Sequence, residues 1–144
     1  MISYAFLTLP DLQDTDVPVI KSLVEQLVNH PTELDRGRIE LILGRASLLI
    51  ARNEEGRIVG MASLYRIPLF SRTVGRVEDV VVDADTRGQG VGRGLMEHLI
   101  EEAKHQGISR LFLTSRPDRI EANQLYQRLG FAIYETNPYK MDLS

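Results

Sequence analysis

The stretch VEDVVVDADTRGQGVGRG, residues 77–94, joins an apolar strand to a turn crowded with arginine and glycine, and then to the start of a helix. Its four glycines, Gly88, Gly90, Gly92 and Gly94, stand at every second position. Glycine within a helix costs roughly 1 kcal/mol relative to alanine. A helix that begins with several glycines therefore indicates that something must lie very close to the backbone there.

The succession of strand, glycine turn and helix is a pattern that binds phosphate. Exposed backbone N–H groups and the positive end of the helix dipole attract an anion, and the absence of Cβ atoms lets a phosphate approach. Arg87 and Arg93 flank the turn and add charge-assisted contacts. A nucleotide P-loop would need a lysine and a hydroxyl residue where the chain has Arg93 and Gly94, and a dinucleotide fingerprint would need GxGxxG in an early βαβ unit. The turn therefore predicts a phosphate ligand of another kind.

Hydrophobic spacing predicts a mixed sheet covered by helices. Apolar runs between turns indicate strands, and apolar residues at helical spacing after a capping residue indicate helices. The expected strands are residues 4–9, 47–51, 57–65, 76–83, 111–114, 131–135 and 139–143. Helices are expected after residues 11–16, after Thr32, after the glycines and after Asp118, and residues 66–75 are expected to form a loop. The order β-α-α-β-β-β-α-β-α-β-β predicts an α/β or α+β fold in one domain, residues 1–144.

The composition excludes several classes of protein. The chain has 43% hydrophobic and 26% charged residues and a net charge of −3, which argues against a nucleic-acid-binding protein. It has no cysteine, so disulfides, thiolate metal sites and a cysteine nucleophile are excluded, and its three histidines lack metal-ligand spacing. No apolar run reaches the roughly 18 residues of a membrane span, and the N-terminus does not resemble a signal peptide. We therefore expect a cytoplasmic protein without a metal.

Two motifs resemble those of the GCN5-related N-acetyltransferases, the GNAT superfamily. The first is Arg87-x-x-Gly90-x-Gly92, and the second is NQLYQRLGF, residues 123–131. Both stand in the order that the family has, within a matching series of elements, and the chain resembles bacterial GNAT proteins. The resemblance implies a mixed central β-sheet of six to seven strands covered by about four helices, in which the fourth and fifth strands splay apart.

The resemblance also implies acetyl-CoA as the acetyl donor. In GNAT enzymes the turn after the fourth strand holds the CoA pyrophosphate through backbone amides, and the pantetheine arm pairs with strand backbone in the splayed gap. The implied cofactor-binding residues are Val80, Val81, Val82, Arg87, Gly88, Gln89, Gly90, Val91, Gly92, Arg93, Asn123 and Tyr126. The valines also fit a buried core, and side chains and main chain can serve both purposes. Many relatives have their asparagine seven residues before the tyrosine, where this chain has Arg119, whereas Asn123 precedes Tyr126 by three.

Three residues are candidates for catalysis. Tyr126 matches the family tyrosine that protonates the leaving thiolate, although a tyrosine on a helix face also packs as an amphipathic side chain. Glu78 is the candidate base for the amine, because strand alternation puts it on a face with Val80 and Val82. It also fits a strand-end carboxylate in water or paired with an arginine, and Asp79 is the second candidate. A main-chain N–H near Val81 or Val82 would hold the developing oxyanion.

The sequence leaves the acceptor open. By the family resemblance, residues 28–38, 66–75 and 134–139 would border it, and because they mix both signs of charge, they single out neither a strongly cationic polyamine nor a strongly anionic sugar phosphate. We expect the acceptor to be a small amine or a protein amino group. VEDVVVD also resembles the glucosamine-6-phosphate N-acetyltransferases, so a sugar phosphate is an alternative within enzymes. Two further classes stay open, a non-catalytic CoA-binding or sensing domain and a nucleic-acid-associated regulator. Because no cysteine can carry the acetyl group, we expect direct transfer in a ternary complex, and the family resemblance implies a homodimer formed through the C-terminal strands.

Overall fold

The computed structural model describes all 144 residues, in two compact units, Met1–Leu113 and Thr114–Ser144. The first unit contains the strands β1 (Ser3–Phe6), β2 (Ser47–Arg52), β3 (Ile58–Pro68), β4 (Thr73–Val82) and β5 (Arg110–Phe112). Its helices are α1 (Asp16–Val28), α2 (Arg36–Leu43) and α3 (Val91–His105), with the short 3-10 helices η1 (Leu9–Asp11) and η2 (Ala84–Thr86). The second unit contains α4 (Ile120–Arg128).

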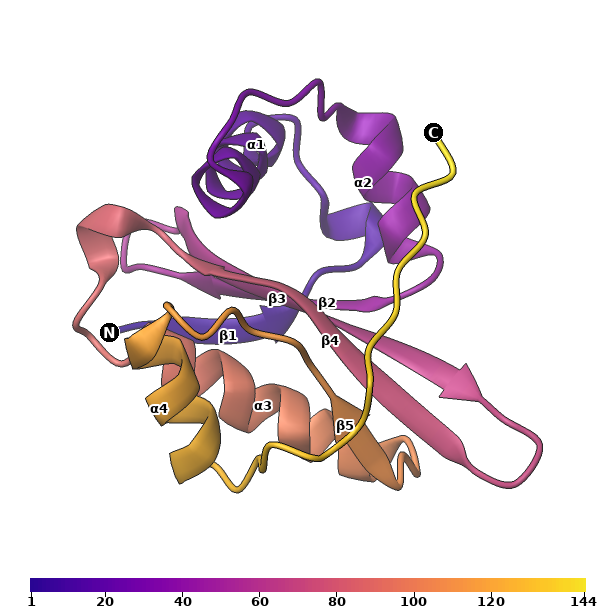
Figure 1. The fold of residues 1–144 in the computed structure, drawn as a ribbon. Helices are drawn as coiled ribbons and strands as arrows, with labels where there is room; N and C mark the ends of the chain where they lie inside the picture. Colours follow the sequence, from indigo (N-terminus) through magenta and orange to yellow (C-terminus); the bar gives the residue numbers. More distant parts are fainter. The chain divides into compact units, whose positions relative to one another are not determined.

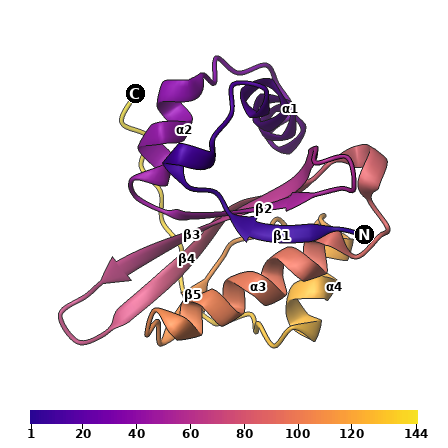
Figure 2. The same ribbon diagram turned by 180° about the vertical axis from the view of Figure 1, so that it is seen from behind.

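The sheet of the first unit follows the order of the chain, β1-β2-β3-β4-β5. Strands β1 to β4 are antiparallel neighbours, and β5 runs parallel to β4 because α3 carries the chain back between them. Figures 1 and 2 show α1 and α2 over one face of the sheet and α3 over the other. Both faces bury apolar side chains, among them Leu23 and Ile39 from the first pair of helices and Leu95 and Leu99 from α3. This arrangement confirms the expected mixed sheet covered by helices.

The expected splay between the fourth and fifth strands is present. β4 pairs with β5 only through Val74, Gly75 and Arg76, whereas it pairs with β3 as far as Val82. Gly75 allows this short contact, since a Cβ there would collide with Leu111 of β5. From residue 77 onward, the β5-facing edge of β4 therefore has no strand partner (Figure 1).

A β-bulge in β4 contradicts the alternation that was expected around Glu78. Ser63 lies opposite Glu78 and Met61 lies opposite Val81, so two residues of β4 face the single residue between Met61 and Ser63. Asp79 accommodates the extra residue by adopting φ 55°, a left-handed conformation that is uncommon for non-glycine residues. Because Met61 and Ser63 share a face, Glu78 shares a face with Val81, and the prediction that it lies with Val82 is wrong.

Two other sequence predictions fail. Residues 66–75 are not simply a loop, because β3 continues to Pro68 and β4 begins at Thr73. Proline is tolerated at the end of β3 because β2 pairs with β3 only as far as Leu64, so this end of β3 is an edge on that side. Residues 131–144 contain no strand, so the sheet has five strands and not six or seven. The TNP turn lacks the glycine that a tight hairpin favours, and apolar alternation without a pairing partner does not make a strand.

Candidate functional site

The glycine turn leads from η2 into α3 with two left-handed residues. Gly88 has φ 85° and Gly90, the N-cap of α3, has φ 77°, and a Cβ at either position would have no neighbour within 4 Å. Side chains are disfavoured here because of the backbone conformation, and the space beside the turn is open. Both glycines are therefore required by the shape of the turn itself.

The N-terminus of α3 presents a row of unpaired main-chain donors. The first main-chain bond of the helix runs from Gly94 N to Gly90 O at 3.0 Å, and the N–H groups of residues 90–93 make no hydrogen bond within the chain. No side chain caps the helix, and its first turn has no acidic residue. Unpaired N–H groups at a helix N-terminus carry the positive end of the dipole, which favours a phosphate or another anion.

Glycine is required at position 94 for a different reason than at positions 88 and 90. A Cβ there would overlap the ring and hydroxyl of Tyr4, which comes from β1 and stacks on His98 with 4.6 Å between ring centroids. Burial, together with the charge of Glu97, raises the pKa of the Tyr4 hydroxyl. The group that lies close to the backbone at Gly94, and leaves no room for a Cβ, is thus Tyr4 of the chain itself and not a ligand.

The free edge of β4 lies next to the glycine turn in sequence and supplies a second binding feature. Val81 is buried in the cluster that α1 and α2 cover, and Val82 lies opposite Gly60, where a Cβ would touch Val91 and Leu95 of α3. The Val81 side chain therefore belongs to the core and that of Val82 is half-buried, while the β5-facing main chain of this segment lacks a strand partner. An extended ligand can pair with such an edge as an added strand does.

The acidic pair of β4 has two different environments. Glu78 forms an ion pair with Arg76, two residues earlier on the same strand. Desolvation by the surrounding protein, and then the charge of Glu78, raises the pKa of the Asp79 carboxyl, while Arg38 acts in the opposite sense. Burial and then the charges of Asp79 and Glu78 likewise raise the pKa of Tyr65, which Arg38 again opposes. Tyr65, a residue that the sequence did not single out, thus lies near enough to both candidate bases for their charges to raise its pKa.

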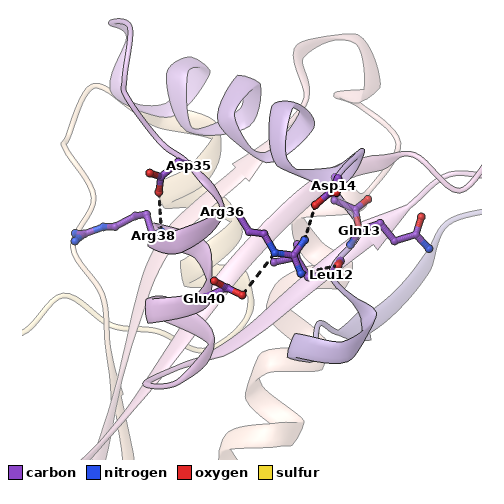
Figure 3. A network of polar contacts seen from close by, with 8 residues as sticks. Leu12, Gln13, Asp14, Asp35, Arg36, Arg38 and Glu40 are labelled. Carbon is purple, nitrogen blue, oxygen red and sulfur yellow. Dashed lines mark hydrogen bonds and ion pairs between the residues drawn. The ribbon is translucent and has the colours of Figure 1, made fainter.

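Two arginines of α2 differ in whether their guanidinium groups form ion pairs. Arg36 is held by Asp14 at 2.8 Å, by Glu40 at 3.5 Å and by the main-chain oxygen of Leu12 at 3.2 Å. Figure 3 shows this network and shows the Arg38 side chain extending away from it, while the Arg38 N–H bonds to Asp35 at the start of α2. Arg36 is therefore structural, whereas the Arg38 guanidinium has no ion pair.

In the second unit, Asn123 and Tyr126 both lie on α4. The Asn123 amide donates to Arg116 O at 2.9 Å, to Arg119 O at 2.8 Å and to Ser115 Oγ at 3.3 Å, so it orders the segment before the helix. Thr114, Ser115, Arg116 and Arg119 line a shallow pocket here. Burial raises the pKa of Tyr126, against the opposing charge of Arg119, and its ring meets Phe131 edge-on at 6.0 Å. Tyr126 thus keeps its proton at neutral pH, as a proton donor must.

Metal-binding clusters and membrane-spanning helices are both absent from the structure. It contains no group of three or more side chains that could hold a metal ion. None of its helices has both the length and the apolar surface to cross a membrane.

Comparison with known proteins gives consistent results. The sequence matches the acetyltransferase (GNAT) family over residues 18–131. It is 37% identical over 95 residues to a glucosamine 6-phosphate N-acetyltransferase of Trypanosoma brucei brucei, a match that covers 64% of this chain and 63% of that protein. It is 28% identical over 124 residues to the ribosomal protein bS18-alanine N-acetyltransferase of Escherichia coli (strain K12), covering 86% and 80%. The crystal structure of a Trypanosoma brucei acetyltransferase superposes with a TM-score of 0.80 at 28% identity, covering 99% of this chain and 100% of that one.

A sheet whose fourth and fifth strands diverge, with a glycine turn and an unpaired helix N-terminus between them, is the fold of an acetyltransferase. The chain belongs to the GNAT family, whose members generally use acetyl-CoA as the acetyl donor. It is an N-acetyltransferase, an enzyme that transfers an acetyl group to an amine.

Proposed function

We propose that the chain binds acetyl-CoA and passes its acetyl group directly to a primary amine in a ternary complex. The observation that carries the proposal is the set of unpaired N–H groups at residues 90–93, beside a β4 edge without a strand partner. The first feature suits a pyrophosphate and the second suits an amide-containing arm. The absence of cysteine excludes an acetyl-cysteine intermediate and so favours direct transfer.

The proposed cofactor-binding roles fall on two segments of the first unit and, by the family resemblance, on α4. Backbone amides of the turn hold the pyrophosphate, Arg87 and Arg93 add positive charge, and the β4 edge pairs with the arm. The residues concerned are Val80, Val81, Val82, Arg87, Gly88, Gln89, Gly90, Val91, Gly92 and Arg93, with Asn123 and Tyr126 of α4. We assign Asn123 an indirect role, because its amide is already engaged with the backbone of Arg116 and Arg119.

We propose Asp79 as the base, with Glu78 as its electrostatic partner. A lysine-like amine has a pKa near 10.4 and must lose a proton before it attacks. A carboxylate with a raised pKa accepts that proton more readily, directly or through a water, than one in its ordinary state. The ion pair of Glu78 with Arg76 occupies the carboxylate that the sequence favoured, and the raised pKa of Asp79 supports the second candidate.

The acid in the proposed mechanism is Tyr126. When bound, acetyl-CoA would supply a thioester, whose carbonyl carbon the amine would attack and whose sulfur would leave. By the family resemblance, the Tyr126 hydroxyl would give its proton to that sulfur, and a main-chain N–H of Val81 or Val82 would donate to the oxygen on which negative charge develops. The raised pKa of Tyr126 supports this role because it keeps the proton in place until the thiolate forms.

The acceptor that we favour is a small amine, with a sugar phosphate as the second candidate. The VEDVVVD stretch and the relative from Trypanosoma brucei brucei support an amino-sugar phosphate. The relative from Escherichia coli supports a protein N-terminal amine instead. Arg38 is a cation without an ion pair that exerts charge on Asp79, which supports an acceptor that carries an anion as well as an amine.

We also propose one catalytic domain, residues 1–144, in a cytoplasmic homodimer. The family match runs across the boundary between Leu113 and Thr114, which supports a single domain. Large apolar side chains are exposed along residues 131–144, among them Ile133, Tyr139 and Leu143, and a second copy would cover them. Light scattering would test the dimer, and a monomer at micromolar concentration would contradict it.

The activity test is release of free CoA thiol from acetyl-CoA, followed with a thiol reagent, against a panel of amines. Because the protein has no cysteine, its own background is low. The panel holds polyamines, amino acids, aminoglycosides, glucosamine 6-phosphate and peptides with free N-terminal alanine or internal lysine. Amine-dependent release that collapses in Tyr126→Phe supports the proposal. If acetyl-CoA neither raises the melting temperature nor is consumed, the assignment of the glycine turn as a pyrophosphate site is wrong.

A further inference from the structure

Gln26, on α1, makes a two-point contact with the segment that leads out of β4. Its side-chain Nε2 donates to Asp83 Oδ1 at 3.1 Å, and its Oε1 accepts from Ala84 N at 3.0 Å. The orientation of the amide is determined by its partners, since a carboxylate only accepts and a main-chain N–H only donates. Gln26 is half-buried, so these bonds lie partly out of water.

The place of this contact matters because residues 83–90, which lead to the buried Val91, have few other hydrogen bonds. Asp83 N bonds to Val59 O of β3 at 2.8 Å, and Thr86 N closes the η2 turn on Asp83 O at 2.9 Å. To these main-chain bonds Gln26 adds two side-chain hydrogen bonds from another element. The anion-binding N–H groups of residues 90–93 thus follow, within a few residues, a segment that α1 fixes through one amide.

We propose that Gln26 is a positioning residue for the acetyl-CoA site, and that it acts by holding residues 83–84 so that the glycine turn presents its N–H groups to the pyrophosphate. This inference rests on the proposed binding of acetyl-CoA. A turn that samples other conformations binds its ligand with an affinity reduced by the fraction of time spent in the competent one. Gln26 therefore acts on cofactor affinity and not on the chemical step.

The test reverses the donor and the acceptor of the hydrogen bond between the side chains of residues 26 and 83. In Gln26→Glu the carboxylate still accepts from Ala84 N, but it can no longer donate to Asp83 and repels its charge. In the double variant Gln26→Glu/Asp83→Asn, the asparagine amide donates to the new glutamate, so the contact with residue 83 is restored with donor and acceptor reversed, while Ala84 N still donates to residue 26. Gln106→Glu is the matched control, because Gln106 Nε2 likewise donates to a carboxylate, Glu102 Oε2 at 2.7 Å, and to Ser47 Oγ at 3.1 Å, at the far end of α3.

The readouts are the Kd of CoA by calorimetry, the melting temperature without ligand, and kcat at saturating acetyl-CoA. We expect Gln26→Glu to weaken CoA binding about five- to tenfold, the equivalent of one lost hydrogen bond, with kcat unchanged. The double variant should recover most of the loss. Gln106→Glu should lower the melting temperature and leave the Kd as in the wild type.

Three results would overturn the proposal. If Gln26→Glu binds CoA as tightly as the wild type, the contact does not position the turn, while the cofactor assignment stands. If its Kd rises and the double variant does not recover, or if Gln106→Glu raises the Kd equally, the effect is one of general stability. If the wild type itself does not bind CoA, the cofactor assignment fails and Gln26 has no cofactor to position.

Discussion

Replacing Gly90 with alanine separates the conformational role of the glycine turn from its binding role. Gly90 has φ 77°, and a Cβ at this position would have nothing within 4 Å, so Gly90→Ala introduces backbone strain without a collision. A left-handed conformation costs a non-glycine residue about 1–2 kcal/mol. For a chain of 144 residues this corresponds to a fall in melting temperature of roughly 3–8 °C.

Gly56 supplies a matched control for that strain. It lies in the turn between β2 and β3 with φ 82°, and a Cβ there also has no neighbour within 4 Å. Gly56→Ala should therefore destabilise the protein about as much as Gly90→Ala. The two variants should differ in the binding of CoA, since only Gly90 belongs to the row of unpaired N–H groups at α3.

The difference in affinity follows from the hydrogen bonds at stake. A bond from a main-chain N–H to a charged phosphate is worth about 1.5–3 kcal/mol, so losing one raises the Kd between about 10-fold and 150-fold. We expect that rise for Gly90→Ala by calorimetry, and a Kd within about twofold of the wild type for Gly56→Ala. Equal affinities in the two variants, after both have been shown to be folded, would refute the assignment of the anion site.

Four further predictions test the rest of the site and the fold around it. Tyr126→Phe should lower kcat by about 100-fold or more with the Kd of CoA little changed, which presteady-state thiol release would measure; an unaltered kcat would exclude Tyr126 as the acid. The raised pKa of Asp79 predicts that kcat/KM falls as the pH drops through that pKa, and Asp79→Asn should remove the dependence along with most of the rate. Because the pKa of Asp79 is raised in the folded protein, its charged form destabilises the fold, and Asp79→Asn should stabilise the protein at neutral pH. The gain should disappear at a pH below the ordinary carboxyl pKa, so a gain at low pH alone would contradict the prediction. Gly94→Ala should cost about 1–3 kcal/mol of unfolding free energy by overlap with Tyr4, and the cost should shrink in a Tyr4→Ala background, as chemical denaturation would show.

The features that the sequence predicted best are the ones encoded locally, the glycine turn and the helix that follows it. Gly88 and Gly90 are glycines because the turn itself needs positive φ, and the helix that follows is marked by its own apolar spacing. The splay of β4 from β5 was expected only through the family resemblance. Nothing in a run such as VEDVVVD indicates where its pairing with another strand ends.

The sequence could not predict features that depend on distant partners. Gly94 stands in the same series of glycines as Gly90, yet its neighbour is Tyr4, which lies in the first strand of the chain. Gln26 looks like an ordinary polar residue on a helix, and its contact with Ala84 exists only once α1 has packed on the sheet. The apolar alternation of residues 131–144 suggested strands, but a strand also requires a partner edge, which no local pattern specifies.

The bulge at Asp79 explains why the face of Glu78 was predicted wrongly, and it also bears on the proposal that Asp79 is the base. Strict alternation assigned Glu78 to the face of Val82, and the extra residue reverses that assignment. A left-handed aspartate costs the fold free energy that a glycine would not, and strain of this kind persists where the surrounding structure enforces it. Here β3 enforces it, by pairing with β4 on both sides of the bulge. The bulge also lies on the part of β4 that β5 leaves unpaired, where desolvation by the surrounding protein, and then the charge of Glu78, raises the pKa of the Asp79 carboxyl. A glycine would relieve the strain but would remove the carboxylate from this edge, so the presence of aspartate at a position whose backbone favours glycine is itself an argument for Asp79 as the base.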